Sequence, residues 1–389
     1  MNEPITIIRL VMSQDSGGIR QSERQYIPAL KAKGLNVVGV VIGDSWGAYG
    51  DQREDFSVLV KTGVQSFKGG LISRVLSVLK EMKNFYKLKR KLQNEILFEQ
   101  NFKDTKVVIN IRRISLLLIA YQLSRQFKGK VIFHSGQSFN KGPLSVNRLF
   151  YGVLKKMKWL RIIANSQYSA LSYGLASDDY VYPGFSDSRI SSNPDIARNR
   201  IREEFGIDDS TLTFLYMARL HEAKAPDILI EAFGTSSEVR KNKSVLILAG
   251  GSSTGDYSDY LQEKICSLGM EKQIKLVGKV DNVSDWYAAS DVFVNSRRGV
   301  EPFGISIVEA MANGLPVIAS ALGGPSETVS HQENGFLVSD SSVDGYREFI
   351  DKIHLDKGAL ARMSEESVKR AQYFTLESQI ERYLLLVME

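Results

Sequence analysis

Two glutamates separated by seven residues offer the clearest chemistry in this chain. Glu301 is followed by Pro-Phe303-Gly304, and Glu309 lies in the apolar run that comes next. A glycine at the start of a helix exposes backbone N–H groups and the positive end of the helix dipole, which suits a phosphate. A carboxylate among apolar residues needs hydrogen-bond donors, and the hydroxyls of a ribose or another sugar supply them. The alternative is a buried helix with one satisfied glutamate.

A pair of cations follows another apolar stretch. Residues 212–218 are expected to form a strand, and Arg219 and Lys224 come after it and before a helix. Ligands of parallel α/β sheets bind outside the carboxyl ends of the strands. A guanidinium fork and an ammonium group at such a place suit a diphosphate. The alternative is a solvated basic loop.

Glycines and one histidine mark other strand ends. Gly17-Gly18 follows the first apolar strand, and Gly250-Gly251 follows the strand expected at 244–249. Such glycines permit a positive φ or the close approach of a ligand to the backbone. His134 ends another strand, where a histidine can position a substrate hydroxyl. We expect no metal and no cofactor, because no histidines stand at metal-ligand spacing and neither an Asp-x-Asp motif nor a P-loop is present.

Strands and helices alternate in two successive sets. The first set has expected strands at 5–11, 36–42, 106–110, 130–134, 161–165 and 180–183, and helices at 71–98 and 114–126. The second has expected strands at 212–218, 244–249, 274–277, 292–295 and 317–319, with helices between them and three more from residue 343 onward. This alternation predicts an α/β protein of two doubly wound, Rossmann-like domains facing a central cleft. The expected boundaries are 1–186, 187–370 and a C-terminal helix, 371–389, that crosses back to the first domain.

Composition excludes several classes of protein. Apolar residues make up 43% of the chain and charged residues 24%, as in ordinary soluble domains. One cysteine, Cys266, excludes an intramolecular disulfide and fits a reducing compartment. No apolar run reaches the roughly 18 residues of a membrane span. The first residues do not resemble a signal peptide, so we expect a cytoplasmic location.

The basic residues are concentrated in the first half of the chain. The helix expected at 71–92 sets apolar and aromatic residues against lysines and arginines, and the segment 149–160 has the same character. Either segment fits a core-facing helix with a solvated basic side, or a helix lying in an anionic membrane interface at the inner face of the cell membrane. Nucleic acid is not expected as a partner, because no recognised binding motif is present.

Over nearly its whole length, the chain resembles the family 4 retaining glycosyltransferases, which have the two-domain GT-B architecture. Its matching motifs are Glu301-x7-Glu309 with Pro-Phe-Gly inside it, Ala-Arg219-Leu-x3-Lys224, and Ser-Gly17-Gly18-Ile-Arg. Supporting matches are Ile-Phe-His134, Ala-Asn165-Ser166, Tyr182-Pro-Gly184, Leu-Ala-Gly250-Gly251, Val-Gly278-Lys-Val280 and Asn334-Gly335-Phe-Leu-Val. The link Arg297-Arg-Gly-Val300 before Glu301 looks longer than is usual in the family.

The resemblance implies a donor-binding role for the second domain. Arg219 and Lys224 would bind the donor diphosphate, together with the backbone after Phe303, at Gly304 and Ile305. Glu309 would accept hydrogen bonds from the ribose, and Glu301 would contact the donor sugar near the reacting carbon. Val280 or Lys279 would touch the base, and Gly250 would also belong to the donor-binding residues.

The same resemblance implies an acceptor-binding role for the first domain. Gly17 and Gly18 would let its first loop approach phosphate or acceptor, and His134 would lie beside the transferred sugar. The implied reaction moves a sugar, with retention and without a metal, from a UDP- or GDP-linked donor to a glycan or lipid-linked acceptor. The likeness fits a bacterial enzyme of surface polysaccharide or lipopolysaccharide biosynthesis. A sugar-nucleotide epimerase-like enzyme and a catalytically silent GT-B partner of another transferase are the alternatives.

Overall fold

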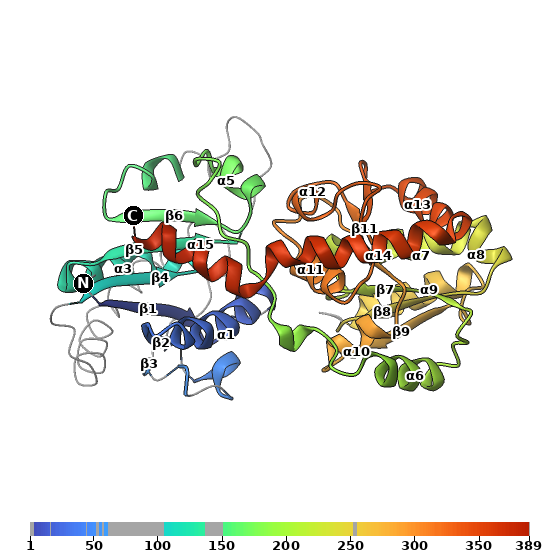
Figure 1. Ribbon diagram of the computed structural model, residues 1–389, viewed down its shortest axis with the longest axis horizontal. Helices are drawn as coiled ribbons and strands as arrows, with labels where there is room; N and C mark the ends of the chain where they lie inside the picture. Colours follow the sequence, from blue (N-terminus) through green and yellow to red (C-terminus); the bar gives the residue numbers. More distant parts are fainter. Residues whose placement is uncertain are drawn as a thin grey trace. The chain divides into compact units, whose positions relative to one another are not determined.

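The chain forms two compact units. The computed structural model describes residues 4–15, 17–43, 45–51, 54–56, 58–60, 105–136, 151–251 and 255–388 (Figure 1). The first unit comprises Met1–Asn165, Ala170–Pro183 and Gln379–Glu389, and the second comprises Ser166–Ser169 and Gly184–Ser378. The chain therefore enters the second unit after Pro183 and contributes its last residues to the first.

A six-stranded parallel sheet forms the centre of the first unit. The strand order is β3-β2-β1-β4-β5-β6, and every described pairing is parallel. Both faces are buried, so the strands are runs of valine and isoleucine rather than alternating sequences. The strands are β1 (Ile5–Met12), β2 (Asn36–Ile42), β3 (Val58–Val60), β4 (Lys106–Ile111), β5 (Lys130–Ser135) and β6 (Leu160–Ala164).

The described helices of the first unit connect and cover these strands. Helix α1 begins at the glycine pair that follows β1, and α3 connects β4 to β5. The chain adds α15 from its far end, and residues 379–388 of that helix group with this unit. The helices are α1 (Gly17–Ala32), η1 (Gly47–Tyr49), η2 (Ile114–Leu116), α3 (Leu117–Phe127), α5 (Gln167–Tyr173) and α15 (Leu376–Met388).

The second unit repeats this sheet with equivalent connections. Its strand order is β12-β11-β10-β7-β8-β9, with all described pairings parallel. The strands are β7 (Leu212–Met217), β8 (Ser244–Ala249), β9 (Ile274–Gly278), β10 (Val292–Asn295), β11 (Val317–Ser320) and β12 (Gly335–Val338).

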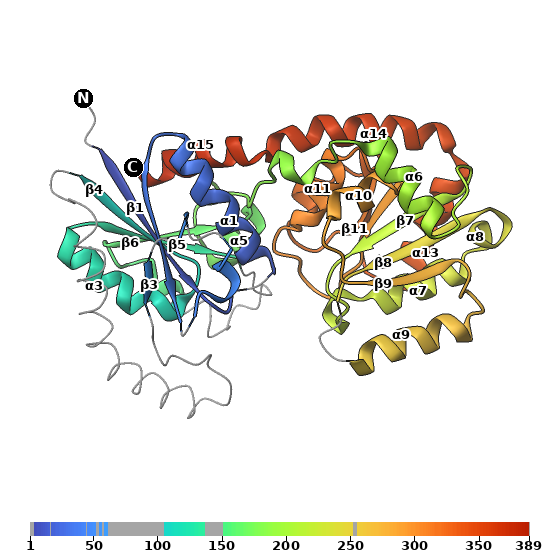
Figure 2. The same cartoon turned by 90° about the horizontal axis from the view of Figure 1, so that it is seen from below.

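Helices cover both faces of the second sheet (Figure 2). Helix α7 packs with α8, α9 and α13 on one face, while α6 packs with α10 and α11 with α14 on the other. Their bounds are η3 (Asp187–Arg189), α6 (Pro194–Glu204), η4 (Glu222–Lys224), α7 (Pro226–Thr235), α8 (Ser237–Lys241), α9 (Gly255–Ser267), α10 (Val283–Ala288), α11 (Ile305–Ala312), α12 (Pro325–Thr328), α13 (Val343–Leu355), α14 (Lys357–Ala371) and η5 (Gln372–Phe374).

The predicted fold class is confirmed, since both units are parallel α/β sheets of Rossmann-like form. Two details differ. Residues 180–183 make one bridge, Ala164 with Tyr180, rather than a strand. The helix expected at 114–126 is divided into η2 and α3. The helix expected at 71–92 lies outside the described residues, as does the start of the basic segment 149–160. None of the described helices is long and apolar enough to cross a membrane.

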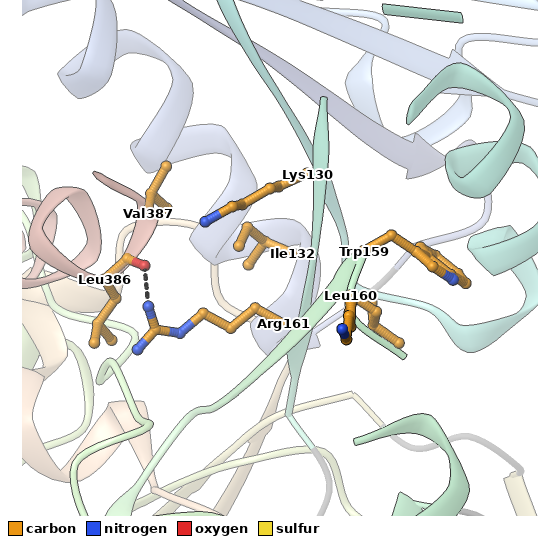
Figure 3. Close-up of a pocket in the computed structure, with 8 residues that line it drawn as sticks. Lys130, Ile132, Trp159, Leu160, Arg161, Leu386 and Val387 are labelled. Atoms are coloured by element: carbon orange, nitrogen blue, oxygen red, sulfur yellow. Dashed lines mark hydrogen bonds between the residues drawn. The ribbon is translucent and has the colours of Figure 1, made fainter. Parts of the chain in front are cut away.

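Basic side chains fasten the end of α15 to the first sheet. Arg161 Nη1 donates to the carbonyl of Leu386 at 2.6 Å, and Lys106 Nζ donates to that of Met388 at 2.8 Å. Cations at the end of a helix satisfy its free carbonyls and favour the dipole. A hollow of about 80 Å³ lies beside this contact, between Lys130, Arg161 and Val387 (Figure 3).

Candidate functional site

The candidate site lies at the carboxyl ends of β7 and β10, which are neighbours in the second sheet. The loop after β7 carries Arg219 and Lys224, and the loop after β10 carries Glu301 and leads into α11 at Gly304. Parallel pairing directs both loops to the same edge of the sheet. The structure therefore brings together residues that lie 77 or more positions apart in the sequence.

Glu301 binds two cations through one carboxylate oxygen. Lys224 Nζ lies 2.6 Å and Arg297 Nη1 2.8 Å from Glu301 Oε2. The side chains are partly enclosed, with exposed fractions of 23% for Lys224, 19% for Arg297 and 9% for Glu301. Within the described residues, no partner is found for Glu301 Oε1. The carboxylate is thus held on one side and open on the other.

The neighbouring cations at this edge of the sheet change the pKa of Lys224. Burial lowers the pKa of Lys224 from its usual 10.5, and the charges of Arg297 and Arg219 lower it further, while Glu301 opposes them. Arg219 is exposed, and its side chain has no hydrogen bond or ion pair with any residue that the structure describes. Three cations against one carboxylate leave a net positive charge at the strand ends, which attracts an anion.

Hydrogen bonds from buried side chains hold the loop after β7 in place. The buried Tyr216 hydroxyl donates to the carbonyls of Arg219 and Lys224, each at 3.4 Å, and Ser296 Oγ donates to that of Ala225 at 2.9 Å. Burial raises the pKa of Tyr216 well above 10, so its hydroxyl keeps its proton and remains a donor. These bonds fix the backbone that carries the two cations.

The link before Glu301, residues 297–300, contains two arginines that bind different partners. Arg297 reaches Glu301, whereas Arg298 pairs with Asp227 at 2.5 Å and donates to the carbonyl of Glu222 at 2.8 Å. The N–H group of Arg298 also donates to the carbonyl of Ala223 at 3.1 Å. The link is therefore fastened to the start of α7, with the first arginine beside the glutamate.

The backbone from Glu301 to Phe303 packs against a glycine pair after β11. Glu301 N donates to the carbonyl of Leu322 at 2.9 Å, and Gly324 N donates to that of Glu301 at 2.8 Å. A Cβ on Gly324 would lie 2.4 Å from Cα of Phe303, so only glycine allows this approach. Ser166 Oγ donates to the carbonyl of Pro302 at 2.6 Å. The Ser166 hydrogen bond is consistent with the grouping of residues 166–169 with the second unit.

Gly304 immediately precedes α11 and has a φ of +88°, a conformation that other residues adopt only at a cost. Helix α11 has no acidic residue in its first turn. No acceptor for the N–H groups of Gly304, Ile305 or Ser306 is found among the described ranges. Free N–H groups at a helix start can receive an anion, and the phosphate predicted for this position stays a prediction.

Glu309 lies on the same helix but is already paired. Arg189 Nε and Nη2 donate to its two oxygens at 2.7 and 3.1 Å, and the Tyr287 hydroxyl donates at 3.1 Å. Glu309 is 2% exposed. Its predicted need for donors is met by protein groups, and binding of a ribose stays a prediction. A ribose would have to share this carboxylate with Arg189, which comes from the segment where the chain enters the second unit.

Three other predicted donor-site residues have different environments. Phe303 is buried, with its ring 5.8 Å from that of Phe374, so only its backbone can serve a ligand. A Cβ on Gly250 would lie 1.8 Å from the carbonyl oxygen of Ala218, so the close approach at this glycine is made by the protein's own backbone. Val280 is partly exposed just after β9, and its contact with a base stays a prediction.

His134 is completely buried near the end of β5, and its predicted place beside the transferred sugar stays a prediction. Its Nε2 atom lies 3.2 Å from the carbonyl of Val181, and Nδ1 has no partner in the part of the chain that is described. Burial lowers its pKa well below 6.5, helped by the charges of Arg112 and Arg9, so the ring is neutral at pH 7. No substrate can touch it without movement of the surrounding residues.

The first unit also contains a buried charge cluster that sequence reasoning missed. Arg9 binds Glu23 through two bonds of 2.7 Å, and Arg112 Nε donates to Glu23 Oε1 at 2.6 Å. Although burial alone would raise it, Arg9 and Arg112 lower the pKa of Glu23 to about 2. Tyr26 and Tyr383 lie 5.2 and 5.4 Å from the Arg9 guanidinium. The signal in the sequence that could have revealed this cluster is Arg9, an arginine within a largely apolar strand.

The glycine pair after β1 begins helix α1. Gly18 lacks a left-handed φ, and nothing lies within 4 Å of the place where its Cβ would stand. Gly17 is the first residue of the helix. Beside them, the buried carboxylate of Asp15 accepts from Arg113 Nε at 2.5 Å. The space next to Gly18 is open, and what it serves stays a prediction.

The described residues contain no group of three or more His, Cys, Asp or Glu side chains that could hold a metal. The hollow of Figure 3 is lined at its sheet side by the first residues of β5 and β6, so it lies at the opposite edge from the strand ends. It includes none of the predicted site residues.

Residues 197–370 match the family model of the glycosyl transferases group 1, and these residues lie within the second unit. The chain therefore carries a glycosyl transferases group 1 domain.

Two curated relatives match about half of this chain and about half of their own length. Mannosylfructose-phosphate synthase of Agrobacterium fabrum is 27% identical over 213 residues, which are 53% of this chain and 46% of the relative. A GDP-mannose-dependent alpha-(1-6)-phosphatidylinositol monomannoside mannosyltransferase of Mycobacterium tuberculosis is 30% identical over 196 residues, 48% of this chain and 49% of the relative.

A solved structure shares the fold of the whole chain. Anabaena Alr3699/HepE, in complex with UDP and glucose, superposes with a TM-score of 0.74 at 22% identity. The superposition covers 98% of this chain and 99% of the Anabaena chain. The fold of both units is thus that of the GT-B glycosyltransferases.

Proposed function

We propose that this protein is a retaining, metal-independent glycosyltransferase with a nucleotide diphosphate sugar, UDP- or GDP-linked, as donor. The carrying observation is the cluster of Lys224 and Arg297 on Glu301, with the charge of Arg219 acting on Lys224, beside the helix start at Gly304. A positive edge with free N–H groups complements a diphosphate, and a carboxylate with one open oxygen complements a sugar hydroxyl. The matched family and the relatives named above support the same class of reaction.

In the proposed reaction, a hydroxyl of the acceptor attacks the anomeric carbon of the donor sugar on the face from which the diphosphate departs. The new bond joins the acceptor oxygen to the anomeric carbon, and the bond from that carbon to the phosphate oxygen breaks. The acceptor proton passes to the departing phosphate. Arg219, Lys224 and the helix start stabilise the charge that develops there, so catalysis is electrostatic and positional.

The acceptor in this proposal is a glycan or a lipid-linked glycan, bound by the first unit. Such an acceptor fits a reaction at the cytoplasmic face of a membrane, which basic segments of the first unit would contact. The mannosyltransferase relative, whose name includes a phosphatidylinositol acceptor, is compatible with this class. Flotation with anionic lipid vesicles tests the membrane contact, and an unbound protein would contradict it.

The donor assignment is tested by a thermal-shift screen followed by a transfer assay. UDP, GDP and their sugar conjugates should raise the melting temperature if one of them binds the folded state. The ligand that does so is then used as donor with glycan acceptors. Absence of both binding and transfer for every UDP- and GDP-linked sugar would overturn the proposal.

Lys224→Ala identifies the site in the same assay. We expect transfer to fall by about 10²–10³-fold, as when one preorganised charge donor is removed from an active site. Lys272→Ala is the matched control, because Lys272 is an exposed lysine before β9, at the opposite edge of the same sheet. Equal activity of the two variants would place the chemistry elsewhere.

A further inference from the structure

Arg297 has no role in the proposed reaction so far, although it is one of only two cations found on Glu301 within the described residues. Its Nη1 atom and the Nζ atom of Lys224 bind the same oxygen, Oε2, at 2.8 and 2.6 Å. Its Nε atom is enclosed and has no described partner. The guanidinium is thus committed to Glu301, and its exposed fraction of 19% leaves it little contact with solvent.

Lys224 has two competing acceptors under the proposed function. Its ammonium group is a compact point charge that binds the Glu301 carboxylate in this structure and would bind the donor diphosphate during turnover. The diphosphate carries the larger negative charge, so it draws the ammonium away from the carboxylate. Without another cation, Glu301 would then lose its only anchor at the moment when the sugar has to be oriented.

We propose that Arg297 is the positioning residue that holds Glu301 in place while Lys224 turns to the diphosphate. The inference rests on the proposed function. Arg297 keeps Oε2, so that Oε1 is directed to a hydroxyl of the donor sugar. The link before Glu301 serves this task, because Arg298 and Asp227 fasten it to α7 and Arg297 is left beside the carboxylate.

The geometry explains why an arginine suits this position. A planar guanidinium keeps its orientation because its donors form a rigid fork, whereas an ammonium group can rotate and exchange acceptors. Arg297 is therefore the cation of fixed orientation, and Lys224 is the cation that can exchange acceptors. Misplacement of a substrate-orienting group by about 1 Å can cost on the order of 10²-fold in rate.

Arg297→Met and Arg297→Lys test the inference, with Arg362→Met, at an exposed arginine of α14, as the matched control. For Arg297→Met, we expect kcat to fall by about 10–100-fold, while the dissociation constants of UDP and GDP, measured by calorimetry, change by less than about threefold. Arg297→Lys should restore most of the lost kcat. Arg362→Met should keep kcat within about threefold of wild type, because its exposed side chain pairs with Asp356 and does not contact Glu301.

A double variant keeps the test decisive if Arg297→Met is poorly folded. When Arg297 acts through Glu301, Arg297→Gln lowers kcat in the wild-type background but has no further effect in a Glu301→Gln background, because the group that it positions has been removed. Additive losses there would overturn the inference. So would a wild-type kcat in Arg297→Met, or a loss of UDP or GDP affinity as large as its loss of kcat, which would make Arg297 a phosphate ligand. A wild-type protein that transfers no sugar would instead overturn the proposed function.

Discussion

The two units place charges near equivalent strand ends but treat them differently. Strands β1 and β4 of the first sheet occupy the positions of β7 and β10 in the second. The first unit encloses Arg9, Glu23 and Arg112 almost completely, with side chains at most 5% exposed. The second leaves the side chains of its cluster, Lys224 and Arg297 on Glu301, between 9% and 23% exposed.

The difference in exposure decides what each cluster can do. Buried charges have lost their hydration, so each depends on its ion-pair partner throughout the life of the folded state. Charges at a partly open edge keep access to solvent, so a ligand can replace a partner at a lower cost in free energy. One topology thus uses charge to hold a helix and a strand together in its first copy and, under the proposed function, to receive an anion in its second.

The largest expected effect is the loss of stability in Glu23→Gln. The change leaves Arg9 and Arg112 buried without a counter-charge, and we expect the free energy of unfolding to fall by about 3–5 kcal/mol. Denaturant unfolding of the first unit measures it. Glu381→Gln, which removes an exposed carboxylate paired with Lys33, is the control and should leave stability nearly unchanged. Similar losses in both variants would remove the distinction between the clusters.

Glu301→Gln should give the reverse pattern. Sugar transfer should fall by about 10²-fold, or roughly 2.7 kcal/mol in transition-state stabilisation, because the open carboxylate oxygen is lost. Stability should change much less than in Glu23→Gln, since Lys224 and Arg297 retain contact with water. A large loss of stability with intact transfer would show that this cluster, too, is structural.

Because His134 is buried in its neutral form, the free energy of unfolding of the first unit depends on pH. Its folded pKa lies well below 6.5, so below pH 6.5 the unfolded chain binds a proton that the folded chain does not. This contribution is fully present above pH 6.5 and is lost as the pH falls, by up to about 1.4 kcal/mol per pH unit. Unfolding curves between pH 6.5 and 5 should be steeper in pH for wild type than for His134→Gln; equal slopes would contradict the assignment.

The smallest expected effect concerns the alkaline limit of the reaction. Lys224 must keep its proton to hold the diphosphate, and its pKa is below 10.5. The rate should therefore fall at a lower pH than an ordinary lysine would impose. Because Arg297 lowers the pKa of Lys224, Arg297→Met should move this limit to higher pH. An unchanged pH–rate profile in Arg297→Met would show that deprotonation of Lys224 does not set the alkaline limit.

The sequence predicted the sheets well because buried parallel strands have continuous apolar runs, as in 36–42, 244–249 and 292–295. The cations and the Gly304 helix start could be placed because parallel strands bring their carboxyl ends to one edge. The partners of Glu309 could not be predicted, since Arg189 lies 120 residues away in a short 3₁₀ turn without periodicity. The burial of His134 depends on residues 180–183, whose irregular path leaves no pattern.

The contribution of α15 to the first unit has a consequence for synthesis. Tyr383 packs against Arg9 and edge-on against Tyr26, yet the ribosome makes it only after the whole of residues 184–378. The unit that begins to form first is therefore completed after its neighbour. Until then, the Arg9 and Glu23 pair lacks one of its covering rings, and a nascent chain halted before residue 379 exposes surface that chaperones and proteases recognise.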